Sequence, residues 1–214
     1  MIKEEFALDA WKSSLRFITE NGTDFIDQNG RVCRQVLNFV MEIKNPSKNI
    51  TAPIELLSSF KTWKYPRLEE ISNIMLSSSK SIDYAYSYGS RIFSFGEKID
   101  QINNYIIPLL KQNQSTRRAY VSVWDPAEDA TGKSDVPGLT ALDFIINEGK
   151  LCMTGIIRSN DIFFGWPANV YQLSVLQEYI CKKLDLPPGS LTVFSVSAHI
   201  FKDQFEFIEK IIKK

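Results

Sequence analysis

The sequence predicts an α+β fold, and three observations support this prediction. Segments with the apolar spacing of helices and segments with the alternation of strands are both frequent, and they do not follow each other in a regular βαβ order. Apolar residues make up 44% of the 214 residues, which is enough for one sizeable core. No repeat or low-complexity tract divides the chain, so we expect a single domain over residues 1–214.

Helical patterning is found in five segments. In the first, Trp11, Leu15 and Ile18 share one face, and Gly22 marks the end of the pattern. The fourth segment is long and mostly apolar, and it begins just after Asn169. We therefore expect helices over residues 8–20, 68–76, 99–111, 170–184 and 205–214.

Strands are expected where β-branched and aromatic residues alternate with polar ones. Residues 31–43 and the segment RRAYVSVWDP (residues 117–126) have this pattern. The segment LTALDFIINEGKLCMTGIIRS (residues 139–159) reads as two strands joined by a turn from Asn147 to Lys150. Pro187 and Pro188 break the chain before a last strand over residues 190–201.

The charge balance and the cysteines exclude several classes of function. The 25 Lys and Arg residues balance 25 Asp and Glu residues, which argues against a nucleic-acid binder that relies on a basic surface. Cys33, Cys152 and Cys181 have no CxxC spacing, so neither a metal site nor a disulfide framework is expected. We find no secretion signal and no apolar run of roughly 20 residues that could span a bilayer. A cytoplasmic protein without a membrane partner is therefore expected.

Paired arginines precede one predicted strand. Arg117 and Arg118 follow Ser115 and Thr116 directly. Two guanidinium groups at such a place can form a bidentate clamp for a phosphate or another small anion. Taken alone, the pair is more often a solvated strand end, so the clamp needs support from elsewhere in the chain.

Further polar groups collect near the ends of two other predicted strands. Arg158, Ser159 and the backbone N–H groups around them would suit an oxyanion, and Asp161 is a charged acceptor beside them. A surface turn is the simpler interpretation of that segment on its own. His199 is the one histidine and stands in an otherwise apolar strand, where a histidine is more often a satisfied core residue.

Together and in this order, these groups resemble one known family. RSNDIFFGWPANV (residues 158–170) is similar to the Arg-Ser-x-Asp-x-Phe-x-Gly-x-Pro-x-Asn signature of the thymidylate synthases, and STRRAYVSVWDP resembles that family's paired-arginine strand. YSYGSRI followed by IDQI, and HIF after SVSA, are similar to further elements of the family. The likeness extends from about Tyr88 to Phe201, and AWKSSLRFITENG and RVCRQVLNFVMEIKNP look like the shorter archaeal-type members.

The resemblance implies a large mixed β-sheet flanked by helices and a homodimer in which sheet packs against sheet. Each nucleotide pocket would borrow arginines from the partner subunit. By position, Arg158 and Ser159 would hold the 5′-phosphate of a pyrimidine nucleotide, and Arg117 and Arg118 would reach it from the other subunit. The mobile N-terminal arginine of the phosphate site corresponds to one of two candidates, Arg31 or Arg34.

The resemblance also implies roles around the base, the sugar and the cofactor. Asn169 would read the edge of the base, because an amide offers a donor and an acceptor that suit uracil O4 and N3–H. His199 would meet the sugar hydroxyl. Asp161 would face the pterin of a folate cofactor such as 5,10-methylenetetrahydrofolate, and Tyr88 would belong to the hydrogen-bond network around the reacting carbon.

The family's nucleophile is missing. The family uses a thiolate that adds to C6 of uracil, and this cysteine follows a proline twenty residues before the signature arginine. The corresponding segment here is DVPGLTAL, in which Pro137 is kept, Gly138 stands in the cysteine's place and Leu139 replaces a polar neighbour. Glycine carries no nucleophile, so the usual covalent step cannot start at this position.

Other cysteines are weak substitutes for that thiol. Cys152 is six positions before Arg158 on the predicted strand, shares its face and could approach the site. An apolar, strand-borne cysteine is usually a core residue, and nothing basic in the nearby sequence would lower its pKa. Cys33 and Cys181 are weaker candidates still.

Further differences from the family pattern concern the residues that would hold the sugar and the residue that would act as general base. Ile157 replaces a Gln before the signature arginine, Phe201 replaces a Tyr whose hydroxyl helps to hold the ribose, and Ser197 stands where an Asp is usual. The family's catalytic glutamate corresponds to Glu70 or Glu69. A pocket with these changes around the sugar would fit a different sugar, such as ribose in place of deoxyribose.

Three functions remain open at this point. The first is an enzyme that transfers a folate-borne methyl or hydroxymethyl unit to a pyrimidine nucleotide or a related heterocycle. Without the cysteine it would need a substrate already nucleophilic at carbon, or a general base among Glu70, Tyr88 and Asp161. The second is a catalytically inactive nucleotide-binding or regulatory dimer, or a partner of an active paralogue. The third is a protein that keeps the fold but not the pocket, with its arginines in structural ion pairs.

Overall fold

The computed structural model describes residues 1–79, 86–131 and 135–213. It contains a mixed sheet of seven strands in the order β1-β3-β7-β6-β5-β4, with β2 also paired to β3. β1 runs parallel to β3 and β6 parallel to β7, while the other pairs are antiparallel. The strands are β1 (Ile2–Glu4), β2 (Thr23–Ile26), β3 (Val32–Ile43), β4 (Tyr120–Ser122), β5 (Leu139–Asn147), β6 (Lys150–Asp161) and β7 (Pro188–Phe201).

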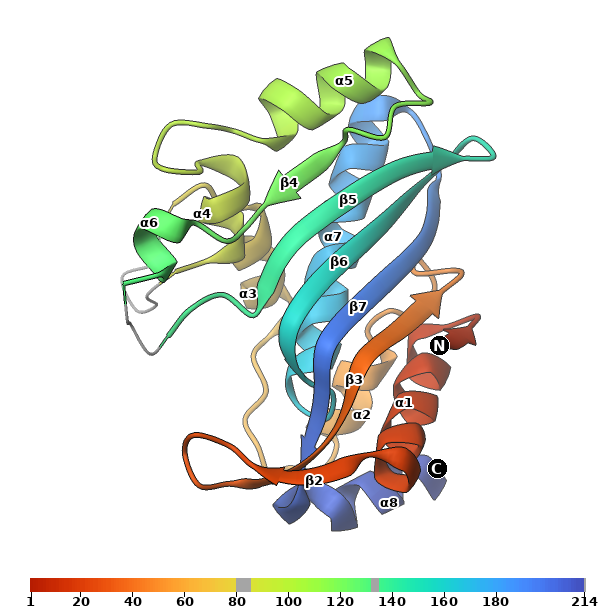
Figure 1. Ribbon diagram of the computed structural model, residues 1–214. Helices are drawn as coiled ribbons and strands as arrows, with labels where there is room; N and C mark the ends of the chain where they lie inside the picture. The colour runs from red at the N-terminus through yellow and green to blue at the C-terminus, as the bar shows by residue number, and fades with distance from the viewer. Residues whose placement is uncertain (80–85, 132–134, 214) are drawn as a thin grey trace.

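Helices connect and cover these strands (Figure 1). The longest is α7, which crosses the back of the sheet and contacts β6 and β7. The α-helices are α1 (Ala7–Asn21), α2 (Ala52–Ser58), α3 (Leu68–Leu76), α4 (Tyr88–Phe93), α5 (Ile107–Gln112), α6 (Pro126–Asp129), α7 (Gly165–Leu184) and α8 (Phe205–Lys213). A π-helical turn, η1 (Ile102–Ile106), leads into α5, and a 3₁₀ turn, η2 (Lys202–Gln204), leads into α8.

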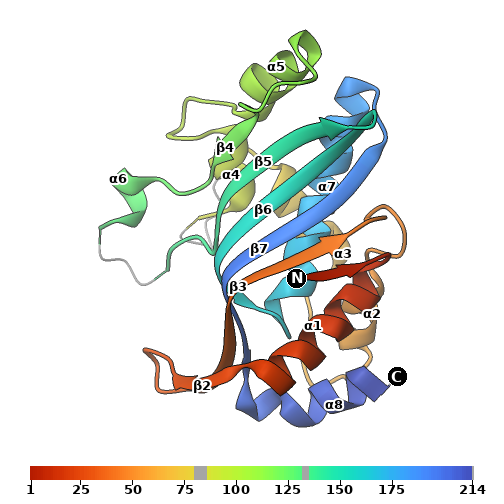
Figure 2. The same ribbon diagram turned by 45° about the vertical axis from the view of Figure 1, so that its right-hand side comes forward.

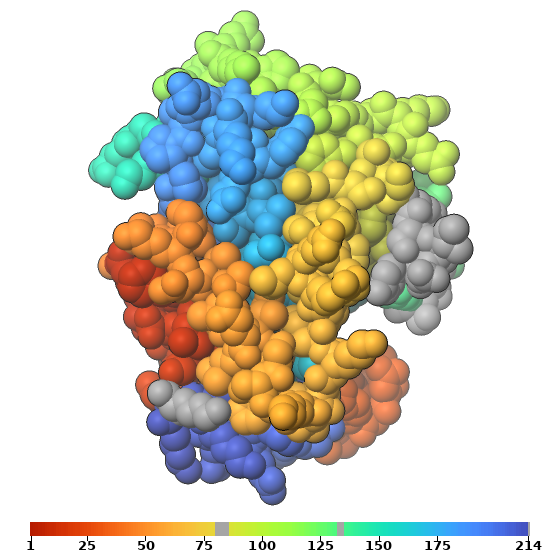
Figure 3. Space-filling model, turned by 180° about the vertical axis from the view of Figure 1, so that it is seen from behind, coloured from red at the N-terminus to blue at the C-terminus, as the bar shows by residue number. Residues whose placement is uncertain are grey.

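The main helices lie on one face of the sheet, and the core lies between the two layers. From behind, α1, α2, α3 and α7 form a continuous cover (Figure 3). Trp11, Phe144, Phe163 and Trp166 are among the largest side chains that are fully buried. Both ribbon views show the opposite face of the central strands without a helix in the described ranges (Figures 1 and 2). The fold is therefore a two-layer α+β architecture with one open sheet face.

Three adjacent strands share a kink that reverses their side-chain alternation. The buried positions of β6 are odd-numbered up to Ile157, but the next buried residue is Asn160. In β7 the same reversal falls between Ser195 and Ala198, which are the register partners of those two residues. β3 has two exposed residues in a row at this level, and one of them, Asn38, has a left-handed φ of 54°. Bulges that bend a strand in this way redirect side chains.

The kink determines which side chains lie on the open face of the sheet at the C-terminal ends of β6 and β7. Beyond it, the even-numbered Ala198 and Ile200 pack into the core. The odd-numbered Asp161 and His199, which pair in register on β6 and β7, therefore lie together on the other face. Arg158 and Ser159 form the exposed kink itself.

The predicted fold class is confirmed, and most predicted elements are present. The predicted helix over residues 68–76 has the observed bounds of α3. The predicted start after Asn169 was wrong, because α7 already begins at Gly165. The last strand starts earlier than predicted, at Pro188, since the first residue of a strand need not donate a ladder hydrogen bond. The predicted helix over residues 99–111 contains a π-helical turn before Pro108, which has no N–H to donate to the preceding turn.

Candidate functional site

A cleft of about 610 Å³ opens between α3, the start of α4 and α7. Glu70 lines it from α3, Tyr88 from α4 and Gln172 from α7. The remaining lining residues are Pro66, Ile71, Asn73, Ile74, Tyr86, Ser87, Asp135 and Ala168. Two residues that the sequence suggested as catalytic, Glu70 and Tyr88, therefore share one cleft. Its volume suits a small ligand.

Glu70 is an ionised group at the edge of this cleft. Arg67 donates to its carboxylate at 2.8 Å, and the backbone N–H of Arg67 donates to it as well. These hydrogen bonds lower the pKa of Glu70. The side chain is thus a carboxylate near neutral pH, which is the form a general base requires.

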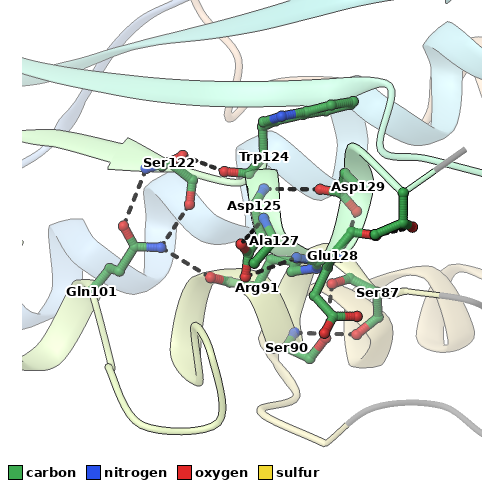
Figure 4. Close-up of polar contacts among 11 residues, drawn as sticks. Ser87, Ser90, Arg91, Gln101, Ser122, Trp124, Asp125, Ala127, Glu128 and Asp129 are labelled. Atoms are coloured by element: carbon green, nitrogen blue, oxygen red, sulfur yellow. Dashed lines mark hydrogen bonds and ion pairs between the residues drawn. The ribbon is translucent and has the colours of Figure 1, made fainter.

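Tyr88 is held in place by a network around Arg91, one turn along α4 (Figure 4). The guanidinium of Arg91 pairs with Asp129 at 2.7 Å and with Asp125 at 3.5 Å, and all three side chains are largely buried. Gln101 donates to the carbonyl oxygens of Arg91 and Ser122, at 2.9 and 2.7 Å. The network joins α4 to β4 and α6, so the short helix that carries Tyr88 does not depend on its own few hydrogen bonds.

Gly138 lies against Tyr88. The N–H of Leu139 donates to the Tyr88 hydroxyl at 3.3 Å. A Cβ atom built on Gly138 would lie 3.4 Å from the Tyr88 hydroxyl oxygen and 3.5 Å from the carbonyl oxygen of Ser159. Gly138 is not among the residues with a positive φ. Neither the backbone nor the space therefore requires a glycine at residue 138.

The three cysteines do not replace that nucleophile. Cys152 packs against the other end of β7, where its Sγ lies 2.6 Å from a Cβ built on Gly189, so the suggested approach of this thiol to the site was wrong. Cys33 is nearer the site end of the sheet, opposite Phe201 in register, but burial raises the pKa of its thiol. Burial also raises the pKa of Cys181, to about 11. None of the three is among the residues lining the cleft.

Arg158 fastens the segment that contains Gly138. Its Nε donates to the carbonyl oxygen of Pro137 and its Nη2 to that of Val136, both at 3.0 Å. Its own N–H donates to the carbonyl oxygen of Gly138 at 2.9 Å. Arg158 and Ser159 remain exposed. The guanidinium therefore positions the Gly138 segment and also presents positive charge at the surface.

Asp161 and His199 form a buried acid–imidazole pair at the end of the sheet. One Asp161 oxygen accepts the N–H groups of Phe163 and Phe164, at 2.9 and 3.0 Å, and so organises the turn that starts α7. Burial raises the pKa of Asp161 and lowers that of His199, which favours a neutral imidazole. His199 Nδ1 is buried and has no hydrogen-bond partner among the described residues. This nitrogen is the free polar atom of the pair.

Both N-terminal arginine candidates, Arg31 and Arg34, form ion pairs within the chain. The Arg31 guanidinium stacks 3.4 Å from the centroid of the Phe201 ring and pairs with Asp203 at 2.9 Å. Arg34 is tied to Asp24 at 2.7 Å and to the carbonyl oxygen of Thr19 at 2.7 Å. The Arg31 side chain is 47% exposed and that of Arg34 is 25% exposed.

Asn169 connects the cleft with the end of the sheet. It lies inside α7 and borders a small gap together with Tyr88, Leu139 and Ile157. Its amide nitrogen is 4.0 Å from a Cβ built on Gly165, and the Asp161 Cβ is 3.6 Å from that same point. The Asp161 and Asn169 side chains therefore lie on either side of Gly165 at the start of α7.

Arg117 and Arg118 are not brought to this site within the chain. They are exposed and border a separate shallow pocket with Leu109 of α5. The loop that carries them lies at the end of the sheet away from α8 and the β2 hairpin (Figure 1). Neither arginine contacts Arg158 or Ser159 in any recorded hydrogen bond or ion pair of the described residues.

Two further properties of the described ranges bear on function. No group of three or more His, Cys, Asp or Glu side chains in them is arranged to hold a metal ion. None of their helices combines the length and apolarity needed to cross a bilayer.

Similarity to known proteins shows the family of this chain. The family model described as "Thymidylate synthase" matches residues 48–214. A protein of Methanococcoides burtonii named "Putative thymidylate synthase" is 36% identical over 213 residues, covering 100% of this chain and 94% of that protein. Proteins with the same name from Methanosarcina barkeri and Methanothermobacter thermautotrophicus are 34% and 32% identical, covering 100% and 96% of this chain and 94% and 95% of those proteins. The chain belongs to the thymidylate synthase family.

Proposed function

We propose that this protein binds a pyrimidine nucleotide and transfers a folate-borne one-carbon unit to it by a route that does not use a cysteine at residue 138. The observation that carries the proposal is the convergence of Glu70, Tyr88 and the backbone of Gly138 on one cleft. Arg158, which is bonded to the Gly138 segment, stands beside it with exposed charge.

In this proposal the phosphate lies at the kink and the base lies toward α7. Arg158 and Ser159 hold the 5′-phosphate, with Arg31 moving from its stack on Phe201 to join them. Asn169 reads the base edge, since its amide faces the same small gap as Tyr88. His199, whose side chain is partly exposed, meets a sugar hydroxyl.

The open face of the sheet supports the proposed homodimer. It carries exposed apolar side chains on four strands: Leu37, Tyr120, Ile145 and Val196 are 60, 48, 46 and 42% exposed. Exposed apolar patches of this kind mark protein–protein contacts. In a dimer built on this face, Arg117 and Arg118 would complete the phosphate site of the partner subunit, which explains their separation from Arg158 in one chain.

The cleft also fits a folate. Pro66, Ile71 and Ile74 offer apolar surface to a flat ring, and Asn73, Asp135 and Gln172 offer polar atoms to its edge. When bound, the folate supplies a carbon at the methylene level of oxidation. Asp161, whose carboxylate is already bonded to the turn before α7, acts on a ligand mainly by holding that turn in place.

The chain's own residues supply the acid–base chemistry. Glu70 is the carboxylate base of the cleft and accepts the proton that leaves the ring carbon. Burial raises the pKa of Tyr88, so its hydroxyl stays protonated and donates a hydrogen bond. Without a thiolate, the electron pair that attacks the one-carbon unit comes from a ring that is already electron-rich at that carbon.

A second function is favoured by one specific feature: residue 138, where the family likeness places the nucleophile, is a glycine. The protein would then be a nucleotide-binding or regulatory dimer, or a partner of an active paralogue, that retains the phosphate site alone. Both functions require nucleotide binding, but only the first requires proton removal from the ring.

One experiment separates the two functions. The protein is incubated with 2′-deoxyuridine 5′-monophosphate (dUMP) or its cytosine analogue, tritiated at C5, and tritium release is measured with and without a folate. Release that Glu70→Gln abolishes supports the enzyme. Binding without release, weakened about 10- to 100-fold by Arg158→Ala but unchanged by the surface variant Arg16→Ala, supports the binding protein. Absence of binding to any phosphorylated pyrimidine would overturn both.

A further inference from the structure

A partly buried tyrosine, Tyr65, joins the segment that leads into α3 to the start of α7. Its hydroxyl donates to the carbonyl oxygen of Phe164 at 2.9 Å and accepts from the N–H of Ala168 at 3.0 Å. These two backbone groups are four residues apart, which is the spacing of one α-helical hydrogen bond. The Tyr65 hydroxyl therefore bridges the acceptor and the donor of the first turn of α7.

Aromatic contacts hold the Tyr65 ring against the same turn. Its ring lies edge-on to that of Phe164, with the centroids 5.1 Å apart at an interplanar angle of 64°. Trp63, two residues earlier, contacts the rings of Phe163 and Phe164 at centroid distances of 5.3 and 6.1 Å. It also contacts the ring of Phe207 in α8, at 4.6 Å. Edge-to-face pairs of this kind are favourable, so the ring of Tyr65 has a fixed place when its hydroxyl forms the bridge.

The bridge connects two walls of the cleft. Pro66, which follows Tyr65, and Ala168, which donates to it, both line the cleft. On one wall the chain continues directly into α3, which carries Glu70. On the other wall Asn169 directly follows Ala168. The carboxylate proposed as the base and the amide proposed to read the ring edge therefore each lie a few residues from the two ends of one bridge.

A second contact between these walls lies one turn further along α7. The Gln172 side-chain amide donates to the carbonyl oxygen of Ile71 in α3 at 3.3 Å, and Gln172 is buried. Gln172 thus holds α3 against the body of α7, whereas Tyr65 holds the first turn. The orientation of Asn169, which stands next to that turn, depends on the second of these contacts.

We propose that Tyr65 is a positioning residue of the cleft: its hydroxyl fixes the first turn of α7 and so orients the Asn169 amide toward a ligand opposite the wall that carries Glu70. This inference rests on the proposed function for the identity of the ligand. The chemistry it selects is a ring whose edge offers one acceptor and one donor to an amide.

The bridge requires a protonated hydroxyl, and the surroundings of Tyr65 provide one. Burial raises the pKa of Tyr65, so at neutral pH it donates to Phe164 and accepts from Ala168 at the same time. A phenylalanine at residue 65 keeps the ring contacts and removes both bonds. The two freed backbone groups can then bond to each other, because their spacing is that of a helix. We therefore expect Tyr65→Phe to move the first turn more than it destabilises the fold.

The positioning of Asn169 can be tested without any ligand. The protein is labelled with ¹⁵N, and the Asn169 side-chain amide resonance is assigned by its loss in Asn169→Ala. We expect Tyr65→Phe to shift this resonance together with the backbone amide resonance of Ala168. Tyr179→Phe is the matched control, because it removes a hydroxyl that donates to Asn103 at 2.8 Å near the other end of α7, and it should shift neither. An unshifted resonance of either amide in a folded Tyr65→Phe protein would overturn the proposal.

The consequence for the ligand is tested with dUMP as the probe. We expect Tyr65→Phe to weaken dUMP binding about threefold to tenfold, the range of one neutral hydrogen bond, and to have no further effect in an Asn169→Ala background. Equal weakening in both backgrounds would show that Tyr65 acts independently of Asn169, and would overturn the proposal. If wild-type protein bound no pyrimidine nucleotide, the proposed function would fail, while the positioning of Asn169 would still be decided by its amide resonance.

Discussion

At the scale of single residues, the position of Gly138 is the most informative feature of the molecule. Its backbone is ordinary, and a Cβ atom there would meet its neighbours at 3.4 Å or more. A side chain at residue 138 would therefore fit without a change of backbone shape.

We predict that Gly138→Cys gains a thiol-dependent activity. The rate of tritium release from C5-labelled dUMP should rise above that of the wild type, because a thiolate at this place can add to C6. Gly138→Ala is the control: it should not raise the rate, and it should stabilise the fold by about 0.4–1 kcal/mol through the unfolded chain. The rate assay and urea unfolding test the two parts. A folded Gly138→Cys protein with unchanged release would contradict the placement of the ring beside residue 138.

The sequence provided candidate site residues where a motif fixed them, as for Arg158, Ser159 and Asn169. Their contacts were not predictable. The sequence could not tell that the Arg158 guanidinium bonds to the backbone of Val136 and Pro137, or that Asp161 is occupied by the N–H groups that follow it. Tyr86 was missed, although the YSY spacing placed two hydroxyls on one side of an extended segment. Such contacts depend on long-range packing that no local pattern records.

At the scale of elements, the buried network around Arg91 anchors α4. Arg91 and Asp129 have side chains that are only 12 and 4% exposed. Breaking such a pair from one side leaves an uncompensated buried charge. We predict that Arg91→Ala lowers the free energy of unfolding by about 3–5 kcal/mol, measured by urea denaturation.

The double variant Arg91→Met/Asp129→Leu tests the reason for that loss. It removes both charges and should recover much of the lost stability, because the cost arises from the orphaned carboxylate. It should not recover nucleotide binding, since α4 would still lack its link to α6. A double variant as unstable as Arg91→Ala would point to packing in place of charge as the cause.

A second charged group ties β2 to β3 and to the start of η2. Asp24 pairs with Arg34 at 2.7 Å and also with Lys202, and these partners lower the pKa of its carboxyl from 3.8 to about 2. A lowered pKa stabilises the fold while the carboxylate is ionised, so this contribution is present above about pH 4 and is lost as the pH falls toward 2. The side chain is exposed, so screening by salt should weaken the effect.

We therefore predict a pH-dependent effect of Asp24→Asn. The variant should be less stable than the wild type at pH 5, and the difference should shrink as the pH falls to 2. Urea unfolding at a series of pH values measures it, with the exposed Glu20→Gln in α1 as the control. A difference that stayed constant over this range would assign the loss to packing and not to ionisation.

At the scale of the whole molecule, the sheet presents an apolar face that no described helix covers. We predict that Val196→Glu, or Ile145→Glu on the neighbouring part of that face, converts a dimer to a monomer in light scattering. Ile99→Glu is the matched control, because Ile99 is 54% exposed but lies outside the sheet. If the wild type is itself a monomer, the proposed sharing of Arg117 and Arg118 fails.

The global architecture was predictable because the patterns were strong. The long helix and the β5–β6 hairpin were found from periodicity and turn residues, and the layers followed from the family likeness. The reversal of side-chain alternation within β3, β6 and β7 was not predictable. An apolar strand with one such irregularity has the same sequence pattern as a regular strand. That reversal determines which face receives Asp161 and His199.

Because β3, β6 and β7 share the kink, a change in the length of one strand affects its fit to the other two. Deleting one residue near Arg158, Val196 or Asn38 would shift every later side chain of that strand to the opposite face, while its neighbours kept their own pattern. Asp161 and His199 would then face different sides of the sheet. The length of the chain between these points is therefore far less free to change than the identity of the residues along it.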